Sequence, residues 1–228
     1  MLRSAALLVL FCSVFPVALL TGPRSPQAGA WLEQTQRGFI SSSLRLRPSG
    51  QELSAYAAYG VTPTLTFGLD LNQSDSGGVQ SAHALAFARL PLRQHDTGWQ
   101  WAMELAAGQR RHSSSWSGVT RVTLSAGRGW QLAGRSGWIA GDLAREWGGP
   151  DATQAWKLDS TLGFNARSGA APILQIELYQ PREAALVSKL LPGLRWSLRN
   201  DRELLTGVEW RSFGDTRLGL RLELWHRF

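Results

Sequence analysis

The sequence predicts an all-β fold, a transmembrane antiparallel up-and-down β-barrel of about twelve strands, with ten strands as the alternative. Three observations predict it. Short segments in which apolar and polar residues alternate follow one another from Gly38 to the C-terminus. After the first thirty residues no apolar run reaches the about eighteen residues that a spanning helix needs, so this part of the chain can cross a membrane only as a closed barrel. The 11 Trp against 3 Tyr suit aromatic belts at the membrane interfaces.

The first thirty residues have the order of a secretory signal peptide. Arg3 precedes an apolar run over residues 5–20, and a polar stretch then ends in small residues at Ala30. We expect cleavage after Ala30, which divides the chain into a signal peptide, residues 1–30, and a barrel domain, residues 31–228. The predicted compartment is the Gram-negative outer membrane.

Composition excludes several function classes. The barrel domain keeps 22 basic and 17 acidic residues, because only Arg3 and Arg24 fall in the leader, and its net charge is +5. These basic residues are spread singly along the segments, which argues against a nucleic-acid partner. The one cysteine, Cys12, lies in the leader, so cleavage would leave the barrel domain without cysteine and a disulfide is excluded. The histidines have no metal-ligand spacing, and no phosphate loop or dinucleotide fingerprint occurs, so we expect no cofactor and no metal.

Eleven alternating segments precede the last one. The first three, at 39–47, 52–59 and 65–72, alternate most cleanly. The face of the fourth, 82–92, stays open, because alternating alanines oppose Leu85, Phe87 and Arg89. Seven more are expected at 99–107, 120–128, 139–147, 156–164, 174–179, 194–199 and 204–211. The polar stretches 73–81 and 110–118 are expected to be loops, and 130–136 a long turn.

Threading these segments alternately up and down gathers outward aromatic residues at two rims, as in membrane barrels. The periplasmic rim is expected to hold Tyr59, Phe67, Trp99, Trp101, Phe164, Trp196 and Phe228, and the outer rim Trp147, Trp156 and Trp210.

The last thirteen residues, TRLGLRLELWHRF, form the clearest strand. One face holds Leu218, Leu220, Leu222, Leu224, His226 and Phe228, and the other is the charged face, with Arg217, Gly219, Arg221, Glu223, Trp225 and Arg227. This pattern resembles the C-terminal assembly signal of Gram-negative outer-membrane β-barrel proteins, although His226 stands where that signal often has an aromatic residue. The resemblance implies that the last strand closes the barrel against the first. It also implies two partners, the outer-membrane lipids and the barrel assembly machinery, and it leaves the oligomeric state open. A polar-backed strand of a periplasmic sandwich is the bland alternative.

The face opposite the apolar one is charged along whole strands, which a packed core would not tolerate, so we expect it to line a lumen. A basic wall is expected from Arg45, Arg47, Lys189, Arg195, Arg199, Arg211, Arg217 and Arg221. An acidic wall is expected from Glu104, Asp142, Glu146, Asp159 and Glu177. An open lumen would place a transverse field on zwitterionic solutes. In a narrow lumen the same residues would reach across and close it with ion pairs.

One enzyme-like constellation is His112-Ser113-Ser114. It resembles the arrangement in outer-membrane phospholipase A and lipid A deacylase, in which a histidine activates the serine two residues later. The asparagine that commonly follows is replaced by Ser115, and parity places His112 on the lumen face with Glu104. The sequence therefore favours a narrow porin-like channel that is not an enzyme. A closed structural or surface-interaction barrel is the alternative, and a lipid hydrolase using His112 and Ser114 a distant one.

Overall fold

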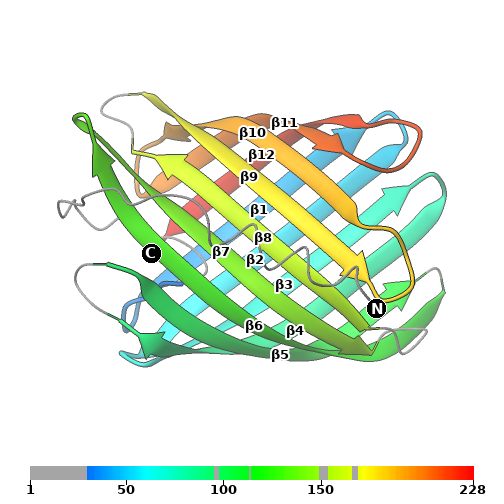
Figure 1. The fold of residues 1–228 in the computed structure, drawn as a ribbon, viewed down its shortest axis with the longest axis horizontal. Coiled ribbons are helices and arrows are strands. Elements are labelled where there is room, and N and C mark those ends of the chain that lie inside the picture. The colour runs from blue at the N-terminus through cyan, green and yellow to red at the C-terminus, as the bar shows by residue number, and fades with distance from the viewer. Residues whose placement is uncertain (1–29, 95–97, 113, 149–153, 166–168) are drawn as a thin grey trace.

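The computed structural model describes residues 30–94, 98–112, 114–148, 154–165 and 169–228, which form twelve antiparallel strands closed into a barrel (Figure 1). The strands are β1 (Gly38–Arg47), β2 (Gly50–Thr62), β3 (Leu65–Ser76), β4 (Val79–Arg93), β5 (Gln100–His112), β6 (Ser115–Leu132), β7 (Arg135–Gly148), β8 (Gln154–Phe164), β9 (Ala170–Pro181), β10 (Val187–Ser197), β11 (Arg202–Arg211) and β12 (Leu218–Arg227). The predicted fold and the count of twelve are confirmed, and the ten-strand alternative is wrong. None of the described residues form a helix that is long and apolar enough to cross a membrane.

The last strand closes the barrel against the first, as its pattern predicted. β12 pairs with β1 from Phe39↔Arg227 to Leu46↔Leu220. Beyond the ladder, the Gly38 amide donates to the Phe228 carbonyl at 2.8 Å and the Phe228 amide donates to the Gly38 carbonyl at 3.0 Å. We call the end of the barrel that holds Gly38 and Phe228 the terminal end, and the opposite end the far end.

Several hairpins are longer than the sequence predicted, and the expected loops shrink to match. Residues 73–81 are mostly strand, because β3 and β4 meet at a turn over the two glycines 77 and 78, both with positive φ. The expected loop 110–118 continues β5 into β6. The long turn at 130–136 is a two-residue turn at Ala133 and Gly134, again with positive φ. The first two of these hairpins extend the strands at the far end, in sequence that is rich in serine and glycine, and the third extends β6 and β7 at the terminal end.

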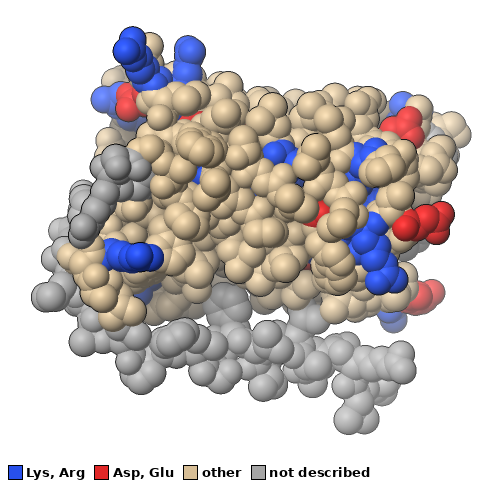
Figure 2. Space-filling model, turned by 90° about the horizontal axis from the view of Figure 1, so that it is seen from above, with Lys and Arg blue, Asp and Glu red and all other residues tan. Residues whose placement is uncertain are grey.

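The outer wall is an apolar belt with aromatic residues towards both rims. Half-exposed leucines line it on every side, and Figure 2 shows charged residues gathered mainly towards the two ends. The aromatic residues expected at each rim lie at the matching strand ends. Tyr59 and Phe67 face each other across β2 and β3 at the terminal end, for example, and Trp147 and Trp156 lie near the far end of β7 and β8. This belt has the form of a lipid-facing surface.

The fourth strand, whose face the sequence left open, turns its larger residues inward. Leu85, Phe87 and Arg89 are buried, and the alternating alanines face outward. Phe87 stacks on Tyr56 with ring centroids 5.2 Å apart. Small and large inward residues thus fill part of the lumen at mid-height.

Candidate functional site

The lumen is the candidate functional site, since the charged face of every strand turns into it. Around β1 and its neighbours, six charged side chains form the first ion-pair network. Arg45 on β1 reaches Glu177 on β9 at 2.6 Å, although β12, β11 and β10 lie between these strands in the barrel. Lys189 on β10 approaches Glu52 on β2 at 3.3 Å. These contacts join side chains from separate walls.

Glu209 on β11 is the most enclosed carboxylate of this network, with no exposed area. Its Oε1 accepts from Arg47 Nε at 2.5 Å, and its Oε2 accepts from Arg47 Nη2 at 2.8 Å. Arg45 Nη1 lies 3.4 Å from Oε2. Glu52 completes the group by accepting from Arg47 at 2.7 Å. One carboxylate thus joins two arginines from β1.

A second network lies on the opposite side of the lumen, over β3 to β7. Arg121 on β6 is its centre and contacts Asp70 at 2.8 Å, Glu104 at 3.4 Å and Glu146 at 3.8 Å. Arg89 contacts Glu104 at 2.6 Å. Further pairs in the lumen are Arg110–Glu146, Lys157–Asp159, Arg195–Glu203, Arg227–Glu203 and Arg221–Glu223.

The structure places the predicted wall residues as follows. Arg45, Arg47, Arg195, Arg211 and Arg221 are buried in the lumen, and Lys189 is half-buried there. Glu104 and Glu146 are buried on the other side, and Asp142, Asp159 and Glu177 face the lumen half-buried. Two predicted residues lie elsewhere: Arg199 is exposed in the turn between β10 and β11, and Arg217 is exposed before β12. Both are correct in parity but lie beyond the ends of their strands.

Each of the two predicted walls carries residues of both signs. Over β10, β11, β12 and β1 the inward basic residues are Lys189, Arg195, Arg211, Arg221, Arg227, Arg45 and Arg47, against Glu203, Glu209 and Glu223. Over β5 to β9 the inward acidic residues are Glu104, Asp142, Glu146, Asp159 and Glu177, against Arg110, Arg121 and Lys157. Arg89 had no place in either predicted wall, because the face of its strand was undecided.

An apolar cluster occupies the lumen at the terminal end. Its ring and aliphatic side chains come from β1, β7, β9, β11 and β12, and they are Phe39, Trp138, Ala140, Ile173, Leu205 and Trp225. Two arginines cover it: Arg195 lies 4.6 Å from the Trp138 ring centroid and Arg227 lies 5.2 Å from that of Phe39. Because these two guanidinium groups stack on aromatic faces, they connect the charged part of the lumen with the apolar cluster.

Residues 30–37, which we call the strap, fold back across the terminal end. The Glu33 amide donates to Thr66 Oγ1 on β3 at 3.1 Å, and the Gln36 amide donates to the Gly60 carbonyl at 2.8 Å. Trp31 packs on the apolar cluster and lies over Gly127 of β6, where a Cβ would come within 2.4 Å of the indole. The strap thus spans the mouth from β2 to β6.

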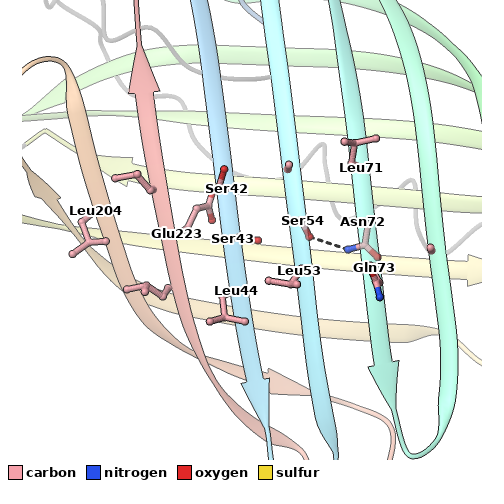
Figure 3. A pocket seen from close by; sticks show the side chains of 14 residues that line it. Ser42, Ser43, Leu44, Leu53, Ser54, Leu71, Asn72, Gln73, Leu204 and Glu223 are labelled. Atoms are coloured by element: carbon pink, nitrogen blue, oxygen red, sulfur yellow. Dashed lines mark hydrogen bonds between the residues drawn. The ribbon is translucent and has the colours of Figure 1, made fainter.

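Two hollows open to the outside. A cavity of about 520 Å³ at the far end of the lumen, the vestibule, is lined by Arg47, Ser49, Glu52, Asn72, Ser74, Ser76, Gly77, Val79, Ser81, His112, Lys189, Arg211, Phe213, Gly214 and Asp215. The other is a shallow groove on the outer wall over β11 to β4, lined by outward residues such as Leu53, Leu71 and Leu204 (Figure 3). The groove faces the lipid side, so the polar site is the vestibule.

Of the enzyme-like residues, His112 lies at the vestibule. His112 is exposed at the end of β5 and lines the cavity, and Ser114 is exposed in the following turn. Ser113 lies outside the described residues. The lumen-side position of His112 agrees with its predicted parity and differs from the lipid-facing site that a lipid hydrolase needs. Within the described part of the chain, no cluster of histidine, cysteine and carboxylate side chains could hold a metal ion.

Comparison with solved structures gives the fold. No protein-family model and no curated protein matches the chain. A KdgM porin solved in complex with disordered oligogalacturonate has a TM-score of 0.58 at 9% identity and covers 83% of this chain and 99% of its own. A NanC porin has a TM-score of 0.54 at 9% identity, covering 82% and 98%. An outer-membrane channel from Pseudomonas putida F1 has a TM-score of 0.55 at 9% identity, covering 90% and 100%. The chain has the fold of an outer-membrane β-barrel.

Proposed function

We propose that the chain is an outer-membrane barrel that offers small polar solutes a narrow, porin-like passage. The observation that carries this proposal is the polar lumen, in which charged side chains from all around the wall pair across the interior. A barrel built only for stability would gain as much from an apolar interior, since replacing buried ion pairs by well-packed apolar residues is often neutral or stabilising. The resemblance to porins and channels supports the same function.

Unsatisfied polar atoms support a hydrated path. Asp142 Oδ1, Asp159 Oδ1 and Gln175 Oε1 are buried on three successive strands and have no hydrogen-bond partner among the described residues. Buried polar atoms in folded proteins are almost always hydrogen-bonded, to protein or to water. Water that reached these atoms would satisfy them, which supports a hydrated path on this side of the lumen.

The unequal charge of the two walls suggests which solutes would pass. The excess of arginine over β10 to β1 faces an excess of carboxylates over β5 to β9, so a field runs across the lumen. A zwitterion aligned with that field could exchange with the ion pairs that cross it, such as Arg45–Glu177. Small zwitterionic and polar solutes are the class we propose.

A closed structural barrel is the second candidate function, and the terminal end favours it. The apolar cluster and the strap both occupy the terminal end, where Trp31 of the strap packs on the cluster. An apolar constriction repels water and ions. In that case the ion pairs would serve only to hold the walls together.

Single-channel conductance separates the two candidates. The refolded chain from Trp31 to Phe228 would be inserted in a planar bilayer and recorded across a salt series. Steady current steps that scale with salt would support passage. A folded barrel that inserts and gives no steps would favour the closed barrel, and failure to insert would contradict the outer-membrane assignment.

A further inference from the structure

The vestibule contains a buried cation, Arg211, that forms no ion pair with a carboxylate among the residues that the structure describes. Arg211, near the end of β11, is only 3% exposed. Its Nε donates to the Thr216 carbonyl at 2.9 Å, its Nη1 to Ser76 Oγ at 3.3 Å and its Nη2 to Ser49 Oγ at 3.0 Å. These acceptors are neutral, and among the residues that the structure describes no carboxylate oxygen lies within the 4.0 Å that defines an ion pair. A buried charge of this kind is costly unless it is paired.

Two lumen carboxylates near Arg211 are already engaged with other cations. Glu209 binds Arg47 and Arg45, and Glu52 binds Arg47 and Lys189. The third carboxylate of this network, Glu177, pairs with Arg45 and Lys189. The three carboxylates thus pair with the cations Arg45, Arg47 and Lys189. A fourth carboxylate, Asp215, lines the same vestibule but is exposed and lies outside ion-pair distance of Arg211, so among the described residues Arg211 keeps no ion-pair partner.

A second cation faces Arg211 directly across the sheet. Lys189 on β10 is its register partner on β11, on the same lumen-facing side. Like charges that stand directly opposite on neighbouring strands repel each other. Both residues line the vestibule, together with the hydroxyls of Ser49, Ser74, Ser76 and Ser81. An anion between them would relieve this repulsion and accept hydrogen bonds from cations and hydroxyls alike.

We infer that the vestibule is a binding site for a small anionic solute, a carboxylate or a phosphate, held by Arg211 and Lys189. The cavity volume of about 520 Å³ exceeds what an inorganic ion needs and accommodates an organic acid of modest size. Arg211 is well suited to the task, because a guanidinium presents a planar fork to a carboxylate or a phosphate. The inference extends the proposed function by naming a solute class for the far mouth, but binding there does not require the lumen to conduct.

Calorimetry with inorganic phosphate tests the site. The refolded protein in a nonionic detergent at low salt should bind phosphate saturably. Arg211→Gln should weaken that binding by about tenfold or more, since hydrogen bonds to charged groups are worth about 1.5–3 kcal/mol. Lys189→Gln tests the same site from the facing strand and should also weaken it. The matched control is Arg199→Gln, which removes the same charge from an exposed turn at the terminal end and should leave phosphate binding unchanged.

Two results would overturn the inference: no saturable phosphate binding by the unaltered protein, or equal binding by Arg211→Gln, Lys189→Gln and Arg199→Gln. The measurement is independent of conductance. Phosphate binding without current steps would keep the anion site and remove the passage. Current steps without phosphate binding would do the reverse.

Discussion

Neutralising Glu209 tests whether the ion pairs of the first network are buried away from water and stabilise the fold, or are screened by water in the lumen. Glu209→Gln keeps the shape of the side chain but removes the charge that faces Arg47 at 2.5 and 2.8 Å and Arg45 at 3.4 Å. Breaking a buried pair by removing one partner costs roughly 3–5 kcal/mol, whereas exposed pairs contribute about 0–1 kcal/mol. Because Glu209 has no exposed area, we expect a loss of about 3 kcal/mol in the free energy of unfolding.

Urea unfolding of the refolded barrel, followed by tryptophan fluorescence, would measure this loss. With a denaturant slope of about 1–3 kcal/mol per molar for small proteins, the midpoint should fall by roughly 1–3 M. Glu183→Gln is the matched control, because Glu183 is exposed in the loop between β9 and β10, and it should change stability by less than about 0.5 kcal/mol. Equal midpoints for the two variants would refute the buried network and indicate a lumen in which water screens these pairs.

Three further predictions concern closure, the strap and the apolar cluster. Deleting Phe228 removes both hydrogen bonds to Gly38 and should lower the folded fraction in a heat-modifiability gel; an unchanged fraction would show that the ladder alone closes the barrel. Burial raises the pKa of Glu33 above its ordinary value, so the docked strap binds a proton more tightly than the free strap and is most stable at low pH. The protection of the strap amides from hydrogen exchange should therefore fall as pH rises, and Glu33→Gln should abolish this trend. A trend that survives in Glu33→Gln would show that Glu33 is not its cause. Gly163→Val would push against the Trp138 indole, whose Cζ2 is 2.1 Å from a Cβ built there, and should cost about 1–3 kcal/mol in urea unfolding; no loss would mean that the cluster repacks freely.

The barrel itself could be predicted because a two-residue period determines which side chains meet lipid and which meet the lumen. The ends of the strands could not be predicted in the same way. Serine and glycine at the far end are typical of loops in a sequence, but pairing across each hairpin keeps these residues extended above the apolar belt. Arg199 and Arg217 show the same effect: alternation gives their side but not the residue at which the strand stops.

Periodicity does not predict which charged side chains pair with each other in the lumen. The sequence does not show on which face of its strand Arg89 lies, because alanine on one face and leucine and phenylalanine on the other differ little in polarity. The contact of Arg89 with Glu104 depends on the register between β4 and β5, in which the two residues stand opposite each other. The strap has no alternation at all, and its place over the mouth follows from a few hydrogen bonds and from Trp31 alone.

The described part of the lumen holds the apolar cluster and the strap at the terminal end and the vestibule at the far end, with ion pairs between its walls. In the proposed channel, the apolar cluster and the strap would form a barrier to current at the terminal end, because an apolar constriction repels water and ions. Selection among solutes, by contrast, would take place in the proposed anion site of the vestibule, where Arg211 donates only to neutral oxygens among the described residues. Because the two zones lie at opposite ends, a substitution in the vestibule should alter which solutes bind without opening the path, and loss of the strap should alter the path without changing what binds.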